Sequence, residues 1–212
     1  MTARAQYWRF GVIAILAVML GVAILALRDE LAVRQADALT LLDPPRAYAL
    51  FEDGRLMPQG PLVPRVAMPT ALAQARAAFG SYDGGARARL LTSARVNLDT
   101  ALAARPAWGD ARVAETYMDF VEKGVGHADT RNAFATSYVE APYLAEAAPW
   151  RLAYGNNQWE ALSPVTQSHM LDEAAWYGRT ADNYRLINEI LTNDDARQRF
   201  RDLHARLAAQ EN

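Results

Sequence analysis

The longest apolar stretch of this chain is the 18 residues from Phe10 to Leu27, FGVIAILAVMLGVAILAL, which contain no charged or polar side chain. An α-helix rises about 1.5 Å per residue, so the stretch would cover about 27 Å, close to the thickness of the hydrocarbon core of a bilayer. Rings and a basic side chain that suit the headgroup region precede it. We therefore expect one membrane span, with the lipid bilayer as a partner and most of the chain on one side of it. The expected anchor residues are Tyr7, Trp8, Arg9, Phe10 and Leu27.

A cleavable signal peptide is the alternative to a retained span, because it too has a basic start and an apolar core. The tripeptide at 21–23, GVA, has the small-x-small spacing of a cleavage site, but large apolar residues prolong the run beyond it. At the end of the run Arg28 follows Leu27 directly, without such a site. We expect the span to be retained.

The orientation of the span depends on a small difference in charge. Arg4, Arg9 and the α-amine precede it, whereas Arg28 and Arg34 follow it, so the amine alone favours a cytoplasmic N-terminus. The chain has no Cys, which is compatible with an oxidising compartment. With a single lysine, Lys123, and abundant Arg and Ala, the composition is typical of GC-rich bacterial genes. We expect a single-pass protein of a bacterial inner membrane, with its main domain in the periplasm.

Prolines divide the remainder of the chain. The helix of the span should continue past the membrane until Pro44 and Pro45 stop it. Six of the ten prolines lie between Pro44 and Pro69, which favours an extended segment. Within it, Asp53-Gly54 between apolar flanks indicates a small hairpin, the alternative being an ordered strap. The expected segments are a short N-terminal tail (1–9), the transmembrane helix (10–27) continuing to 42, a Pro-rich strap or linker (43–69) and an α-helical domain (70–212).

Helix signals recur from Thr70 to the C-terminus, and no credible strand follows residue 60. Apolar residues repeat at three- and four-residue spacing between capping residues, as in amphipathic helices joined by short turns. The expected N-caps are Thr70, Asp110, Ser163, Thr180 and Asn193, and the expected core includes Leu90, Leu98, Phe120, Phe134, Leu152 and Leu171. The predicted fold class is all-α, with an N-terminal transmembrane helix followed by helical hairpins.

One stretch resembles part of a tetratricopeptide repeat (TPR). Ala94, Leu98, Ala101 and Pro106 have the spacing of the second helix of that repeat, in which small residues let the paired helix approach closely. The positions that correspond to the first helix of the repeat do not follow its pattern; they are Ala78, Ser81, Tyr82 and Gly85. No second copy of the pattern appears 34 residues away. The chain therefore resembles a degenerate, TPR-like hairpin protein over about a fifth of its length.

A later stretch resembles segments of single-span, TPR-like proteins associated with bacterial envelope and surface-polysaccharide assembly. It consists of Arg151, Trp159, Leu162-Ser163-Pro164, Glu173 and Trp176. The resemblance implies a scaffold role and no reaction.

The residues offer little that could carry catalysis. His169 and Glu173 lie one helical turn apart and could bind a cation, but no third ligand has a recognisable spacing, so a solvated helix face is the simpler interpretation. The other histidines are His127, in a turn, and His204, in the last helix. No thiol, nucleophile elbow, nucleotide-binding loop or zinc-protease motif is present. We expect no enzyme activity, no cofactor and no metal.

Aromatic residues are concentrated near the C-terminus, and two interpretations of them stay open. Stacked rings could form a carbohydrate-binding groove, or they could pack between helices. The candidate surface consists of Trp150, Tyr154, Trp159, Trp176 and Tyr177.

These features predict a membrane-anchored helical scaffold that binds other membrane or periplasmic proteins in an envelope complex. One alternative is a single-span accessory subunit of a membrane enzyme complex, in which small residues of the span would line a helix contact. Another is a periplasmic glycan-binding module. A net charge of −2 provides no basic surface for nucleic acid, so we expect none as a partner.

Overall fold

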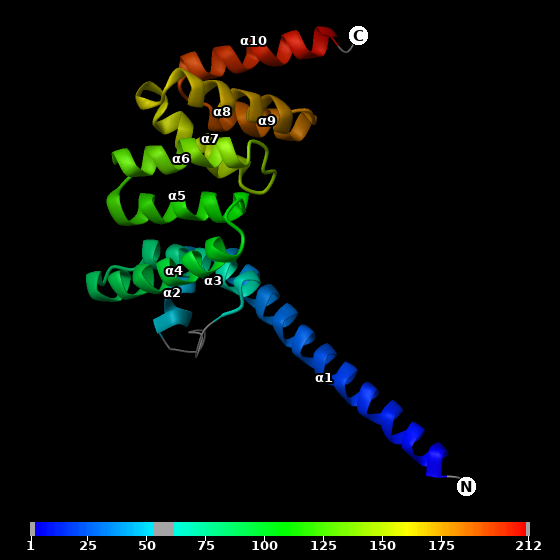
Figure 1. The fold of residues 1–212 in the computed structure, drawn as a ribbon. Helices are drawn as coiled ribbons and strands as arrows, with labels where there is room; N and C mark the ends of the chain where they lie inside the picture. Colours follow the sequence, from blue (N-terminus) through cyan, green and yellow to red (C-terminus); the bar gives the residue numbers. More distant parts are fainter. Residues whose placement is uncertain (1–2, 53–61, 211–212) are drawn as a thin grey trace.

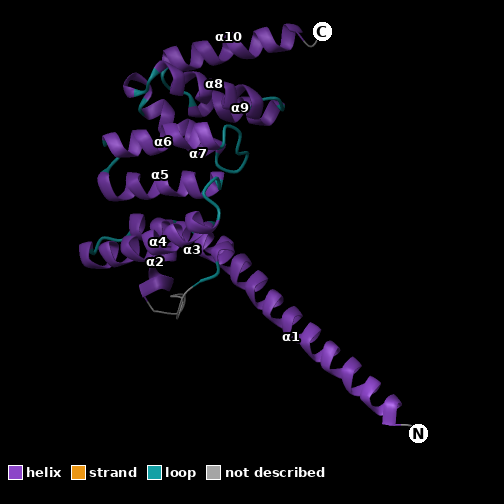
Figure 2. Ribbon diagram, in the orientation of Figure 1, coloured by secondary structure: helices purple, strands orange, loops and turns teal. Residues whose placement is uncertain are grey.

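The computed structural model describes residues 3–52 and 62–210, with the backbone alone for residues 3–11 and for Leu39. All regular structure in these residues is helical, and no strand occurs among them (Figure 2). The all-α class is thus confirmed for the described chain. The helices are α1 (Ala3–Thr40), α2 (Pro44–Glu52), α3 (Pro64–Gly80), α4 (Gly84–Ala104), α5 (Gly109–Lys123), α6 (Ala128–Glu140), α7 (Ala148–Asn157), the 3₁₀ turn η1 (Trp159–Ala161), α8 (Pro164–Tyr177), α9 (Ala181–Ile190) and α10 (Asp194–Gln210).

Helix α1 is a continuous rod of 38 residues that projects from a stack formed by the other helices (Figure 1). Its stretch Val12–Ala38 is long and apolar enough to cross a membrane, and none of its most apolar window is buried against protein. Helical backbone already begins at Ala3, so the described residues of the expected tail (1–9) are part of α1, which ends at Thr40 rather than at residue 42.

The expected anchor residues all belong to α1. Leu27 is exposed, as a lipid-facing side chain should be. The side chains of the other four, at positions 7–10, lie outside the described part of the structure.

The described residues of the Pro-rich segment 43–69 do not form an extended strap, since α2 and the beginning of α3 occupy most of them. Pro44 and Pro64 stand at the first positions of these helices, where the missing N–H removes no hydrogen bond. Pro69 is inside α3 and buried there, so packing outweighs the bond that it forfeits.

Two further expectations for this region also change. Thr70 is not an N-cap; it lies within α3 and donates its hydroxyl to the carbonyl oxygen of Val66 at 2.8 Å. Asp53 and Gly54 of the expected hairpin lie outside the described residues, and the flank before them is helical in α2.

Helix α3 lies at the centre of the N-terminal half, where it packs against α1, α2, α4 and α5. Its faces are lined by fully buried alanines: Ala67, Ala71, Ala73, Ala75, Ala77 and Ala78. A Cβ added at Gly80 would come within 2.4 Å of the carbonyl carbon of Pro44, so glycine lets α2 begin against the end of α3. Gln74 is buried among these small residues and hydrogen-bonds Ser93 and Asn97 of α4.

The stack contains two hydrophobic clusters, one formed by α2 to α5 and the other by α6 to α10. Phe120 and Trp150 pack against both clusters. Gly155 brings α7 close to its neighbours, because an added Cβ would lie 2.4 Å from the sulfur of Met170. The two halves are therefore joined by aromatic side chains.

Several predicted caps are confirmed in the C-terminal half. Ser163 and Thr180 accept hydrogen bonds from the backbone amides of Thr166 and Asn183, at 3.1 and 3.3 Å. Asn193 accepts one from Ala196 at 3.0 Å. Asp110 does not cap α5, whose N-cap is Trp108, although its charge in the first turn suits the helix dipole.

The predicted core is largely confirmed. Its aliphatic members and Phe134 are buried, whereas Phe120 is partly exposed because it fills the seam between the two clusters.

Leu98 of α4 is 1% exposed within the N-terminal cluster. The substitution Leu98→Ala should lower the free energy of unfolding by about 2–5 kcal/mol, because the site cannot fully collapse around the lost atoms. Val96 on the same helix is 62% exposed and provides a control, with an expected cost of Val96→Ala below about 0.5 kcal/mol. Denaturant unfolding of the detergent-solubilised chain measures both. Equal losses for the two variants would contradict this packing.

Candidate binding surface

A cleft of about 640 Å³ opens where the end of α1 meets α3, α5 and the beginning of α7. Its floor is apolar and aromatic, from Met68 and Leu72 of α3, Val113 and Tyr117 of α5, and Trp150 of α7. The rings of Tyr117 and Trp150 meet edge to face, with centroids 5.5 Å apart. Burial raises the pKa of Tyr117, and nearby Arg76 opposes this only in part. A neutral phenol and an indole thus both line the floor.

The rim of the cleft is mainly acidic. Asp37, Asp110 and Glu146 line it, and none of these carboxylates forms an ion pair within the part of the chain that the structure describes. Arg76 is the basic rim residue; it donates to the carbonyl oxygen of Leu42 at 3.5 Å, while its Nε is buried without a hydrogen-bond partner among the described residues. An apolar floor with unpaired carboxylates suits a ligand that carries both apolar and basic groups.

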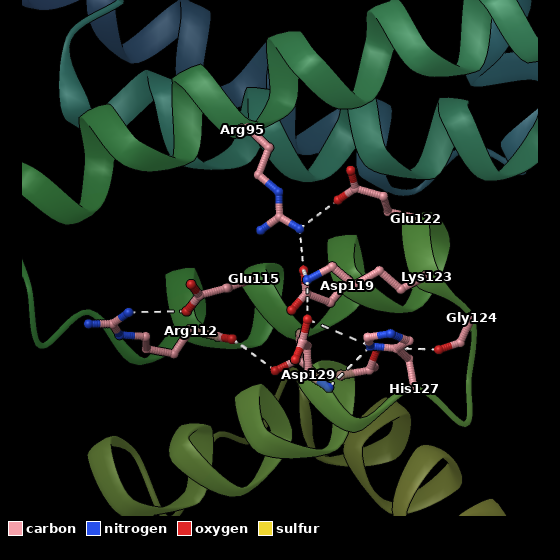
Figure 3. Close-up of polar contacts among 11 residues, drawn as sticks. Arg95, Arg112, Glu115, Asp119, Glu122, Lys123, Gly124, His127 and Asp129 are labelled. Atoms are coloured by element: carbon pink, nitrogen blue, oxygen red, sulfur yellow. Dashed lines mark hydrogen bonds and ion pairs between the residues drawn. The ribbon is translucent and has the colours of Figure 1, made fainter.

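A ladder of charged side chains connects α4, α5 and α6 (Figure 3). Arg95 of α4 reaches Asp119 and, at 2.9 Å, Glu122 of α5. Lys123 continues the ladder to Asp119 at 3.4 Å and to Asp129 of α6 at 3.0 Å. The hydrogen bond and charge of Lys123 lower the pKa of the Asp129 carboxyl. These charges satisfy one another, so the ladder orients adjacent helices and offers few free groups to a ligand.

A second set of ion pairs lies beside this ladder (Figure 3). Arg112 of α5 contacts Glu115 at 3.1 Å and Glu140 of α6 at 2.6 Å. Both sets therefore join α5 and α6.

Arg151 of α7 and Glu173 of α8 form an ion pair in the C-terminal core, where both side chains are fully buried. Their closest atoms lie 3.4 Å apart. Glu173 also accepts hydrogen bonds from the Tyr138 hydroxyl at 2.9 Å and from the Leu144 amide at 3.1 Å. Arg151 donates to the carbonyl oxygen of Ala141 at 2.8 Å, and its guanidinium lies 3.6 Å from the centroid of the Tyr138 ring.

Burial raises the pKa of the Glu173 carboxyl, although Arg151, Leu144 and Tyr138 act in the opposite direction. Burial also raises the pKa of Tyr138 well above its usual value, so its hydroxyl stays protonated and donates. Glu173 therefore holds α6, α8 and the connection before α7 together.

The candidate cation pair does not assemble a site. Glu173 is occupied by the partners just described, and His169 is half-buried near the Tyr138 ring. In residues 3–52 and 62–210, no three His, Cys, Asp or Glu side chains come together as a metal site would require. His127 instead caps α6 by accepting the Asp129 amide at 3.2 Å, and His204 packs near Tyr184.

The five candidate aromatic residues do not form one surface, because the helices distribute them between the core and the periphery. Tyr154 and Trp159 are buried, and their polar atoms are used internally, by the carbonyl oxygen of Val125 and the carboxylate of Asp195. Trp150 is half-buried in the cleft floor. Trp176 and Tyr177 are also half-buried, and Trp176 lies beside the exposed ring of Tyr143. Trp150 lines the cleft together with Tyr117 and apolar side chains of α3 and α5.

Sequence reasoning missed the cleft and the buried ion pair. The cleft residues come from four helices separated by up to 113 positions, from Asp37 to Trp150, so no local spacing links them. The one available signal was the apolar content of residues 62–68, which is too high for a solvated linker.

Replacing Glu173 by Leu should cost about 3–5 kcal/mol of unfolding free energy, because it leaves the Arg151 charge buried without its partner. Combining Glu173→Leu with Arg151→Met should recover much of this loss, since no charge then remains to be desolvated. The exposed pair Arg185–Asp182 is the control, and Arg185→Met should change stability little. Denaturant unfolding of the single and double variants gives the coupling energy between Glu173 and Arg151. If the losses of the two single variants simply added up in the double variant, the assignment of a buried ion pair would be contradicted.

No family model, no curated protein and no solved structure matches this chain. Its own residues and geometry are therefore the basis for assigning a role.

Proposed function

We propose that this chain is a membrane-anchored helical scaffold of a bacterial envelope complex, with its N-terminus in the cytoplasm and its helical stack in the periplasm. The observation that carries the proposal is the projection of an apolar, fully exposed segment of α1 from a folded stack (Figure 1). In water this surface would be a large exposed apolar patch, whereas in a bilayer it is solvated by acyl chains.

The stack supports a binding role. Ala94, Leu98 and Ala101, which resemble a TPR second helix, are buried in α4, where small residues permit close helix packing. Outside the stack's core, the cleft presents Trp150 and Tyr117 beside carboxylates that form no ion pair with the residues that the structure describes. Tryptophan, tyrosine and charged rims are typical of protein interfaces. The proposed ligand of the cleft is a segment of another envelope protein that presents apolar and basic side chains.

An accessory subunit of a membrane enzyme complex is the second candidate, and the exposure of α1 favours it equally. A span without a protein partner in this chain could pack among the helices of another protein. The glycan-binding alternative has less support, because no two of the five candidate rings are exposed side by side.

A reporter that is active only in the periplasm should give signal when fused to the C-terminus of the full chain, and the product should remain in the membrane after a high-salt wash. A reporter active only in the cytoplasm should give signal at the N-terminus, because the α-amine favours that side. Deleting residues 10–27 should release the chain from the membrane. A mature N-terminus beginning near Ile24, or the reverse reporter pattern, would contradict the proposal.

Charge reversal at the rim tests the cleft. Glu146→Lys combined with Asp110→Lys should reduce the amount of partner that co-purifies in mild detergent severalfold, because basic groups then face a basic ligand. Glu189→Lys, at an exposed position of α9, is the charge-reversal control and should leave co-purification unchanged. Unchanged partner levels in the rim variant, with the chain still folded, would exclude the cleft as the docking site.

A further inference from the structure

The helical stack contacts α1 almost immediately after the apolar run ends. Side chains from Val12 to Arg28 are all exposed, whereas Asp29 and Glu30 are already half-covered. Ala36, two turns later, is buried. No free stalk therefore separates the apolar run from the folded stack.

An ion pair marks this first contact. The Glu30 carboxylate accepts a hydrogen bond from the Arg65 guanidinium at 2.8 Å, although the two residues are 35 positions apart. Further along, Arg76 of α3 donates to the carbonyl oxygen of Leu42, just beyond α1. Later residues of α1 thus pair with later residues of α3, so the two helices run in the same direction. The N-terminal end of α3 is therefore the end that lies nearest to the apolar run.

The distance from the apolar run is small on the scale of a bilayer. Glu30 is three residues after Leu27, which is about 4.5 Å along a helix. The headgroup layer on each side of the hydrocarbon core is about 5–7 Å thick. Val63 precedes Arg65 at the beginning of α3 and is 43% exposed. An apolar side chain beside an arginine suits this layer, where apolar groups face acyl chains and guanidinium groups meet phosphates.

We propose that the beginning of α3, residues 62–65, rests in the lipid headgroup layer, and that the Glu30–Arg65 pair holds the stack at this fixed height. The proposal rests on the proposed insertion of α1 in the membrane. Its consequence is that the cleft lies close to the bilayer surface, because Asp37 on its rim follows Glu30 by seven residues, about two turns of α1. The ligand of the cleft would then be the membrane-proximal part of a partner rather than a distant domain.

Because the chain contains no Cys, single-cysteine labelling can test this contact in the full chain reconstituted in phosphatidylcholine vesicles. Lipids with a nitroxide on the headgroup should quench a fluorophore on Val63→Cys severalfold more than they quench a fluorophore on Val165→Cys. Val165 is 64% exposed on α8, in the part of the stack away from α1 (Figure 1). A fluorophore on Met19→Cys, quenched by lipids with a nitroxide on the acyl chain, reports whether α1 is inserted.

Equal quenching at positions 63 and 165, with position 19 quenched by the acyl-chain nitroxide, would overturn the contact and leave the anchor intact. An unquenched label at position 19 would overturn the anchor and this proposal together. Arg65→Glu should reduce quenching at position 63, and Glu30→Arg in the same chain should restore it. Arg185→Glu on α9 is the matched charge reversal and should have no effect. Unchanged quenching with Arg65→Glu would overturn the role of the ion pair.

Discussion

Close packing around α3 is the constraint on which the rest of this structure depends. Alanine methyl groups on several faces of α3 let α1, α2, α4 and α5 approach it together, which larger side chains would prevent. Gln74, buried within this packing, bonds to Ser93 and Asn97 and so fixes how α3 and α4 are aligned. Because α1 packs on the same helix, the direction in which the apolar rod leaves the stack is set by this one element.

The second half of the molecule is held to the first by different means. Rings of Phe120, Trp150 and Tyr154 meet across the seam, with centroid separations of 5.6–6.4 Å, and the Arg151–Glu173 pair organises the helices behind them. Trp150 contributes to both the seam and the cleft floor. The proposed binding surface is thus built on a residue whose position the fold already determines, which reduces the ordering cost of binding.

Much of the helical pattern could be predicted from local residues, because capping and amphipathic periodicity act within a few positions. Ser163, Thr180 and Asn193 cap the helices that they were expected to cap, and Leu98 and Phe134 lie in the core. The prediction of an extended segment was wrong for residues 44–52 and 64–69, where prolines at the beginning of helices were interpreted as helix breakers. Local pattern cannot show that α2 and the beginning of α3 gain enough burial to be helical.

The sequence by itself determined the apolar run, the all-α class and several helix boundaries in the C-terminal half, since these depend on composition and on residues one to four positions apart. The tertiary structure alone decided which polar residues became buried and which stayed exposed to solvent. Glu173, expected on a solvated face beside His169, is buried against Arg151 and Tyr138. The carboxylates of Asp37, Asp110 and Glu146 converge on one cleft only because four helices meet there. Such long-range proximity leaves no periodic trace along a single chain, because it depends on how whole helices pack.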